Sequence, residues 1–391
     1  MSSFAGAHRC RDRRGGCRGQ ADRVERGPLM DLRDGPEEAA FRATLRTWLE
    51  ANVPSGLRGF RGWSGPALEL GRDWSKRLAR AGYAGLTWPK EYGGAGQPWR
   101  YQAVYLEELA RAEAPQHLGV IGLGMAGPTI IAHGRPDQKT RYLAKILSAE
   151  DIWCQGFSEP GSGSDLASVR TRVELIGDRF VVNGQKVWSS YAHVADRCIL
   201  LGRSATASEK HEGLTYLIVD MKSPGVEVRP LRQITGEAEF NEIFFTDVAV
   251  PKENLLGEIG GGWRVAMTTL SHERGTFGFA LAGALDVAVR KLVALARERA
   301  ATDALVRDRV AREWIDLQAL RYTNYRALAR LERTGVPGPE GSVAKLRWSE
   351  ANQRLTKLAI EIIGREAQVA DGDEAPAYWR HQQLRSRGNT I

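Results

Sequence analysis

The sequence predicts an α+β protein: an N-terminal helical domain, a central antiparallel β-domain and a C-terminal antiparallel helical bundle. Two observations predict this order. Hydrophobic residues recur every three or four positions up to about residue 150 and again after residue 262, the spacing that puts them on one face of a helix. Between 151 and about 250 they occur instead in short β-rich runs separated by turn residues, which is typical of strands.

Residues 1–29 are expected to form a disordered basic tail. They contain seven arginines and three acidic residues, half of the formal net charge of +8, and almost no large apolar residue. Such a composition does not build a core, and the apolar stretch of a secretory signal is missing. A well-patterned helix follows Met30 directly, so we predict that Met30 is the natural start.

The N-terminal helical domain is expected over 30–150. Phe41, Leu45, Trp48 and Leu49 follow the i, i+4, i+7, i+8 spacing of a core-facing helix, and Pro54 and Gly56 after them predict its end. Further helices are predicted near 73–82, 99–113, 127–134 and 136–148, with a glycine-rich loop at 93–97.

The β-domain is expected over 151–258. The predicted strands are Phe180–Val182, Cys198–Leu201, Leu214–Val219 and Glu242–Phe245, and the predicted turns are Gly177-Asp178, Asn183-Gly184 and Pro224-Gly225.

The helical bundle is expected over 259–391, because three long amphipathic stretches suit antiparallel packing. The first stripe is Leu281, Leu285, Ala288, Leu292 and Leu295; the second is Val306, Val310, Trp314 and Leu317; the third is Leu346, Leu355, Leu358 and Ile362, after a loop at 335–341.

Composition narrows the functional class. The sequence contains no run of about 18 apolar residues, so it predicts no transmembrane helix. The four cysteines match no disulfide framework or zinc site, which favours a reducing cytoplasm and no metal. The charge outside the tail is mild and does not indicate a nucleic-acid partner.

Two neighbouring segments stand out as a candidate site. Trp153–Asp165 runs from apolar residues into Ser158-Glu159-Pro160-Gly161-Ser162-Gly163-Ser164, where Pro160 and three glycines force a turn. Backbone N–H groups in such a turn can converge on an anion, although an ordinary surface loop has the same composition. In the second segment, Asn183–Ser190, a turn is expected to lead into a strand that presents an indole and two hydroxyls.

Together these segments resemble the flavin-binding strands of the acyl-CoA dehydrogenase family. The resemblance covers roughly residues 33–391. It continues through Trp88-Pro89-Lys90-Glu91-Tyr92-Gly93-Gly94, Val250-Pro251-Lys252-Glu253-Asn254-Leu255-Leu256-Gly257 and Gly260-Gly261-Gly262-Trp263.

The resemblance implies FAD as the cofactor and α,β-dehydrogenation of an acyl-CoA thioester as the reaction. No side chain accepts hydride, so this chemistry needs a cofactor, and no strand–GxGxxG–helix unit is present for a dinucleotide. By resemblance, the cofactor-binding residues are Gln155, Phe157 and Ser158 along the ring edge, Gly163 and Ser164 near the phosphates, Trp188 against the ring, Ser190 near its reactive nitrogen, and Arg299 for a neighbouring subunit's pyrophosphate.

The catalytic base implied by the resemblance is Glu273. Most relatives carry a glutamate in a Tyr-Glu-Gly-Thr loop near the C-terminus, but this sequence stops at Ile391, where that loop would begin, and we expect a truncated chain. A minority carry the base on the first helix after the β-domain, and Ser271-His272-Glu273-Arg274 matches that position. The alternative is that Glu273 is a surface residue paired with an arginine.

The expected partners are an acyl-CoA substrate, an electron-transferring flavoprotein and further subunits of a homo- or heterotetramer. The substrate is expected to be either a fatty acyl or a steroid-derived CoA ester. The stretch Arg299–Asp303 lacks the aromatic residue and the glycine of the family's Arg-x-x-Phe-Gly pattern. Two other functions stay open: a non-catalytic partner subunit, and a flavin oxidase that uses oxygen directly.

Overall fold

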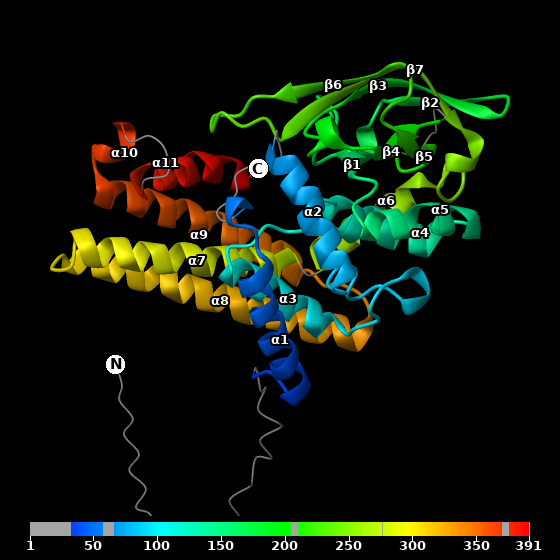
Figure 1. Cartoon of the computed structure of the whole chain (residues 1–391). Coiled ribbons are helices and arrows are strands. Elements are labelled where there is room, and N and C mark those ends of the chain that lie inside the picture. The colour runs from blue at the N-terminus through cyan, green and yellow to red at the C-terminus, as the bar shows by residue number, and fades with distance from the viewer. Residues whose placement is uncertain (1–32, 58–65, 205–209, 276, 370–374, 391) are drawn as a thin grey trace, which may run out of the picture. The chain divides into compact units, whose positions relative to one another are not determined.

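Helices, a β-sheet and again helices follow one another along the chain, so the predicted order is confirmed (Figure 1). The computed structural model describes residues 33–57, 66–204, 210–275, 277–369 and 375–390, without the side chains of 273–277. The predicted tail 1–29 and Met30 lie outside the described residues. Residues 35–391 form one unit that contains every element described below.

In the N-terminal helical domain, a buried carboxylate fixes α1 on α3. Glu108 of α3 is 2% exposed and accepts hydrogen bonds from Arg46 (2.8 and 3.0 Å), Arg42 (3.1 Å) and Arg111 (2.9 Å). Burial alone would raise its pKa, but the three arginines lower the pKa to about 2. The helices are α1 (Pro36–Asn52), α2 (Pro66–Arg80), α3 (Trp99–Arg111), α4 (Gly127–His133) and α5 (Pro136–Leu147).

A π-helix, Gly122–Ala126, leads into α4 where the chain passes Trp88. The Trp88 indole donates to Leu123 O (3.2 Å). A Cβ on Gly127 would lie 2.1 Å from the Trp88 ring, so only glycine lets this helix approach. π-helical turns are often found near functional sites.

The seven-stranded sheet has the order β1-β4-β2-β3-β7-β6, with β5 paired to β4. One prediction is corrected here: the sheet is not wholly antiparallel, because β4 pairs in parallel with both β1 and β2. The strands are β1 (Trp153–Gly156), β2 (Arg172–Ile176), β3 (Arg179–Lys186), β4 (Arg197–Arg203), β5 (Leu214–Asp220), β6 (Val226–Leu231) and β7 (Phe240–Pro251).

A second correction concerns Asn183-Gly184, which is not a turn between strands. It lies inside β3, at a register shift against β7. Gly184 has φ +154°, and an added Cβ would lie 2.6 Å from Thr171 Oγ1, so the glycine permits close packing. The strand ends at Lys186, and Trp188 lies beyond it.

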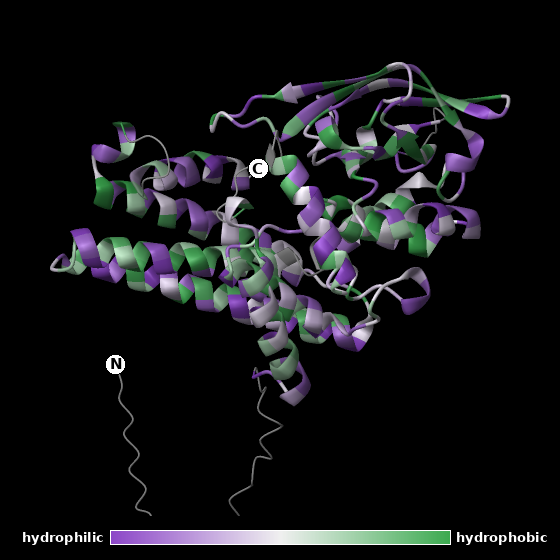
Figure 2. Ribbon diagram, viewed as in Figure 1, coloured by the Kyte–Doolittle hydropathy of each residue, from purple (hydrophilic) through white to green (hydrophobic). Residues whose placement is uncertain are grey.

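The bundle is built on α7, α8 and α9, which pack on one another side by side (Figure 1). Hydrophobic and hydrophilic residues are mixed along all three helices (Figure 2). Leu285, Leu292 and Leu355 are buried as predicted, but Trp314 and Leu346 are 51% and 58% exposed, which corrects their assignment to core stripes. The helices are α6 (Gly262–Gly275), α7 (Phe277–Arg299), α8 (Ala304–Thr334), α9 (Glu340–Ile363), α10 (Glu366–Val369) and α11 (Ala375–Ser386).

Among the residues that the structure describes, no helix is both long and apolar enough to span a membrane.

Candidate active site

The two segments singled out in the sequence meet at the end of β3. Val187 N–H donates to Ser158 O (2.9 Å). The ammonium of Lys186 donates to Phe157 O (2.9 Å) and to Glu159 Oε1 (2.8 Å). The loop after β1 is therefore fixed against the segment that carries Trp188.

Lys186 and Glu159 form a buried ion pair. The Lys186 side chain is fully buried, and burial lowers its pKa to about 8 although Glu159 acts in the opposite direction. Glu159 also accepts backbone N–H groups of Arg170 (2.7 Å) and Thr171 (2.8 Å). Burial raises the pKa of Glu159, but Lys186 and these bonds outweigh it, and the net pKa is lowered. Sequence reasoning missed this pair, although the lysine of Gly184-Gln185-Lys186 lies in a motif that it had selected.

Trp188 presents its indole to solvent from a strained backbone. The side chain is 61% exposed, φ is +60°, and the ring meets Phe240 edge to face with centroids 6.0 Å apart. Positive φ is unfavourable for a tryptophan, so neighbouring contacts must hold this conformation.

Those contacts come from the start of β7. Ser189 N–H donates to Asn241 O (3.0 Å), and Tyr191 N–H donates to Glu239 O (2.9 Å). The Asn241 amide donates in return to Ser189 O (3.0 Å). The segment Trp188–Tyr191 is thus held on both sides of the indole, by Ser158 before it and by β7 after it.

The other predicted cofactor residues differ in their surroundings. Phe157 is 4% exposed and packs edge to face on Tyr216, so its ring belongs to the core and only its backbone is left for a ligand. Ser158 and Ser190 are partly buried, and Gly163 and Ser164 are exposed.

Arg299 lies in the last turn of α7, on the helical bundle, where it pairs with Glu366 (2.7 Å). The structure therefore does not bring Arg299 to the segment that carries Trp188. Glu273 lies in the last turn of α6, and its side chain is outside the described residues. Beside it, burial lowers the pKa of His272.

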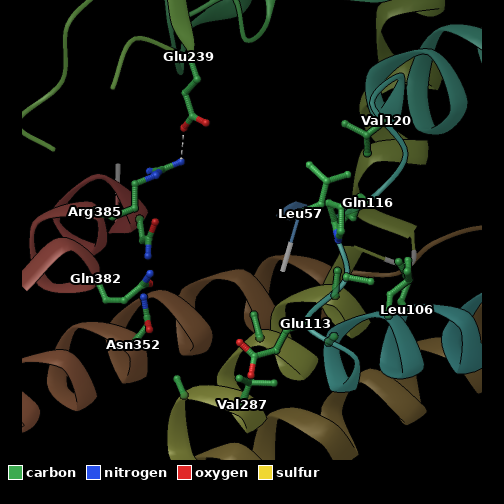
Figure 3. A pocket seen from close by; sticks show the side chains of 18 of the residues that line it. Leu57, Leu106, Glu113, Gln116, Val120, Glu239, Val287, Asn352, Gln382 and Arg385 are labelled. Carbon is green, nitrogen blue, oxygen red and sulfur yellow. Dashed lines mark hydrogen bonds and ion pairs between the residues drawn. The ribbon is translucent and has the colours of Figure 1, made fainter. Parts of the chain in front are cut away.

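A cavity of about 610 Å³ opens next to this region (Figure 3). Leu57, Leu106 and Val120 of the N-terminal domain line one side, while Asn352 of α9 and Gln382 of α11 line the side opposite (Figure 3). The remaining lining includes Ala110, Glu113, Gln116, His117, Tyr191, Glu237, Glu239, Ala280, Ala284, Val287, His381, Arg385 and Asn389.

An ion pair and a histidine–carboxylate contact join α11 to the β-domain at the cavity wall. Arg385 Nη2 donates to Glu239 Oε1 (2.8 Å), and His381 Nε2 lies 2.9 Å from Glu237 Oε1. Burial raises the pKa of Glu239 in spite of Arg385. Burial also raises the pKa of Glu237, but the bond to His381 outweighs it and the pKa is lowered. No spacing in the sequence links residues 237–239 to 381–385.

Known protein families match each of the three parts of the chain. The N-terminal, middle and C-terminal domain models of acyl-CoA dehydrogenase match residues 35–150, 154–248 and 260–388. The chain belongs to the acyl-CoA dehydrogenase family. Acyl-CoA dehydrogenase IpdE1 of Mycobacterium tuberculosis is 43% identical over 360 residues, which are 90% of this chain and 92% of that protein.

Solved structures of acyl-CoA dehydrogenases share the fold. A "Tcur3481-Tcur3483 steroid ACAD" is 30% identical with a TM-score of 0.83, covering 93% of this chain and 94% of that one. The "ChsE4-ChsE5 complex from Mycobacterium tuberculosis" is 28% identical with a TM-score of 0.81, and the same shares are covered. The predicted family, fold class and oxidoreductase class are confirmed.

Acyl-CoA dehydrogenases are FAD-dependent, and FAD is the cofactor of this chain. The residues around Trp188 fit such a group. The buried atoms Gln155 Nε2, Ser189 Oγ and Asn241 Oδ1 have no hydrogen-bond partner within the described part of the chain, whereas buried polar atoms are nearly always paired. At Gly163 no described atom lies within 4 Å of an added Cβ, so a ligand can approach the backbone. Within the same residues, no group of three His, Cys, Asp or Glu side chains could hold a metal.

Proposed function

We propose that this acyl-CoA dehydrogenase removes hydrogen from the α and β carbons of an acyl-CoA thioester, with Glu273 taking the α proton. FAD supplies the hydride acceptor. The observation that carries the proposal is the joining of the Gln155–Ser158 and Val187–Ser190 segments around an exposed indole, held by Lys186.

The proposed cofactor contacts follow from the position of each group. The indole of Trp188 gives an exposed face for stacking, and the hydroxyls of Ser158 and Ser190 lie on the two segments that meet. We assign Gln155, Phe157 (through its backbone), Ser158, Trp188 and Ser190 to the ring, Gly163 and Ser164 to the phosphates, and Arg299 to the cofactor of a neighbouring subunit.

Glu273 is proposed as the base because the family resemblance assigns that role to the first helix after the β-domain, α6, and the helix that follows it, α7, lines the cavity. Ala280, Ala284 and Val287 of α7 line the cavity. A carboxylate held in an apolar site beside an acyl group has a raised pKa, which improves it as a base near neutral pH.

The cavity favours an acyl group that is bulky and carries oxygen substituents. Ala110, Ala280 and Ala284 leave room for a wide skeleton, and the leucines on one side suit its apolar face. Asn352 and Gln382 on the other side have side-chain amides for hydroxyl or keto groups. A straight chain would offer those amides no hydrogen-bond partner. The name of the steroid ACAD agrees with a ring-bearing substrate.

The decisive experiment is anaerobic bleaching of the bound flavin by a panel of CoA esters. We expect oxygenated alicyclic acyl-CoA esters to bleach faster than straight-chain esters of similar size. Glu273→Gln should keep the flavin and lose at least about 10²-fold in bleaching rate, with Glu150→Gln, an exposed residue paired with Lys145, as the control. Unchanged bleaching by Glu273→Gln would overturn the base assignment.

A non-catalytic partner subunit is the second candidate, because two similar structures carry paired names, Tcur3481-Tcur3483 and ChsE4-ChsE5. Purified protein that binds no FAD and shows no 450 nm band would favour it. For the electron acceptor we propose an electron-transferring flavoprotein; steady peroxide formation under air would favour an oxidase instead. A homo- or heterotetramer in the cytoplasm remains our prediction.

A further inference from the structure

We propose that Arg385 is a positioning residue for Trp188, acting through Glu239 and Phe240 across the wall of the cavity. The inference deepens the proposed function, and it rests on that function in taking Trp188 as the flavin-facing residue. Arg385 lies on α11, nearly 200 positions along the chain from Trp188.

Arg385 makes two contacts with the start of β7. Its guanidinium donates to Glu239 Oε1 (2.8 Å) and lies 5.6 Å from the ring centroid of Phe240. The arginine and glutamate side chains are 34% and 16% exposed. A partly desolvated, charge-assisted hydrogen bond with a stacked guanidinium holds its partner more firmly than an exposed ion pair does.

Phe240 and its neighbours pass this restraint to the indole. Phe240 meets Trp188 edge to face, with ring centroids 6.0 Å apart at 86°. Glu239 O accepts the N–H of Tyr191, three residues after Trp188. Because the backbone of Trp188 has the strained φ of +60°, these contacts contribute to holding the indole in its position.

The residues that hold Trp188 also line the cavity, so a ligand in the cavity would lie beside them. Arg385, Glu239 and Tyr191 all line the cavity, and Figure 3 shows the Arg385–Glu239 pair at its edge. His381, one turn before Arg385, holds Glu237 in the same way. An acyl group that enters the cavity therefore contacts the residues that position Trp188. We infer that its binding changes the position of the indole against the cofactor.

Arg229 offers a matched control. It pairs with Glu227 of β6 (2.7 Å) and lies 4.3 Å from the ring centroid of Phe244 of β7, so it makes the same two kinds of contact elsewhere in the sheet. The pair is exposed and does not line the cavity. Arg229→Gln removes an equal charge without touching the proposed path.

The test measures FAD binding to the apoprotein and acrylamide quenching of Trp188 fluorescence, taken as the difference from Trp188→Phe. Arg385→Gln should weaken FAD binding by about 10- to 100-fold and make the indole more accessible to quencher, while Arg229→Gln changes neither. Arg385→Lys, which keeps the charge but not the planar stack, should fall between the two.

Three outcomes decide the inference. Wild-type quenching and FAD affinity in Arg385→Gln would overturn it. So would a loss of FAD binding that is matched by loss of the folded circular dichroism signal, since that indicates a merely structural contact. If the wild-type apoprotein binds no FAD, the proposed function fails, while the quenching comparison still supports or overturns the positioning role.

Discussion

Replacing Lys186 with methionine should weaken the fold and the cofactor site together. The ammonium donates to Phe157 O and Glu159 Oε1 from a fully buried position. Methionine fills a similar volume but leaves the carboxylate of Glu159, 9% exposed, with only its two backbone N–H partners. Breaking a buried pair by removing one partner costs about 3–5 kcal/mol, and we expect a loss in that range.

The assay is urea unfolding of the apoprotein, with FAD affinity measured on the same samples. Lys222→Met is the control, because the Lys222 side chain is 79% exposed in its pair with Asp196, and such pairs contribute at most about 1 kcal/mol. Lys186→Met should also bind FAD more weakly, since Phe157 and Glu159 lose their link to β3.

Removing both charges provides the internal check. In Lys186→Met combined with Glu159→Gln, the uncompensated carboxylate is gone, so part of the lost stability should return. A loss below about 1 kcal/mol in the single variant, or a double variant no more stable than Lys186→Met alone, would refute the reasoning.

Two further predictions concern the N-terminal helical domain. Burial lowers the pKa of His117 to about 4. As the pH falls from about 6.5 to 4, the unfolded chain therefore binds a proton at His117 before the folded chain does, and about 3 kcal/mol of stability should be lost across that window. Urea unfolding at pH 7.5 and at pH 4.5 should show a smaller loss of stability in His117→Gln than in the wild type. Gly127→Ala places a Cβ 2.1 Å from the Trp88 ring and should lower the stability by about 1–3 kcal/mol or more. Gly124→Ala is the control: no described atom lies within 4 Å of its Cβ, and it should lower the stability by less than about 1 kcal/mol. Equal losses of stability in the two variants would show that the π-helix is not held by the contact with Trp88.

Periodicity predicted the helices and strands because each is determined by nearby residues. It failed where a distant segment decides the structure. Asn183-Gly184 has the composition of a hairpin turn, yet β7 pairs with the chain on both sides of it, and the strand continues through the glycine. The glycine was correctly predicted to need backbone freedom. The prediction that this freedom makes a turn was wrong, because Gly184 instead permits close packing against Thr171.

The exposed Trp314 and Leu346 show a second limit of periodicity. Both lie on amphipathic helices, and spacing alone cannot say which apolar residues face a partner within the chain. In this unit they remain 51% and 58% exposed. Large exposed apolar residues on packed helices often mark contacts with another subunit, which agrees with the proposed tetramer.

The candidate site was predictable in part, for a physical reason. The motif residues Gln155, Ser158, Trp188 and Ser190 lie on two segments that meet through Val187 N–H and Ser158 O, and they were grouped in advance by the resemblance to the family rather than by periodicity. The cavity is lined by residues from at least five separate segments. Its charged residues, such as Glu239 and Arg385, have no mutual spacing that a sequence could reveal.

The strained backbone at Trp188 explains why so many contacts converge on one exposed side chain. A left-handed tryptophan costs roughly 1–3 kcal/mol, and glycine at this position would remove that cost. Glycine would also remove the indole face, so relief of strain and loss of the proposed cofactor contact come together. The bonds from Ser158 before the residue and from Asn241 and Glu239 after it leave the segment little freedom to relax. Trp188→Gly should therefore gain stability in the apoprotein and lose affinity for FAD, whereas a loss of both would show that the indole is needed for packing rather than for binding.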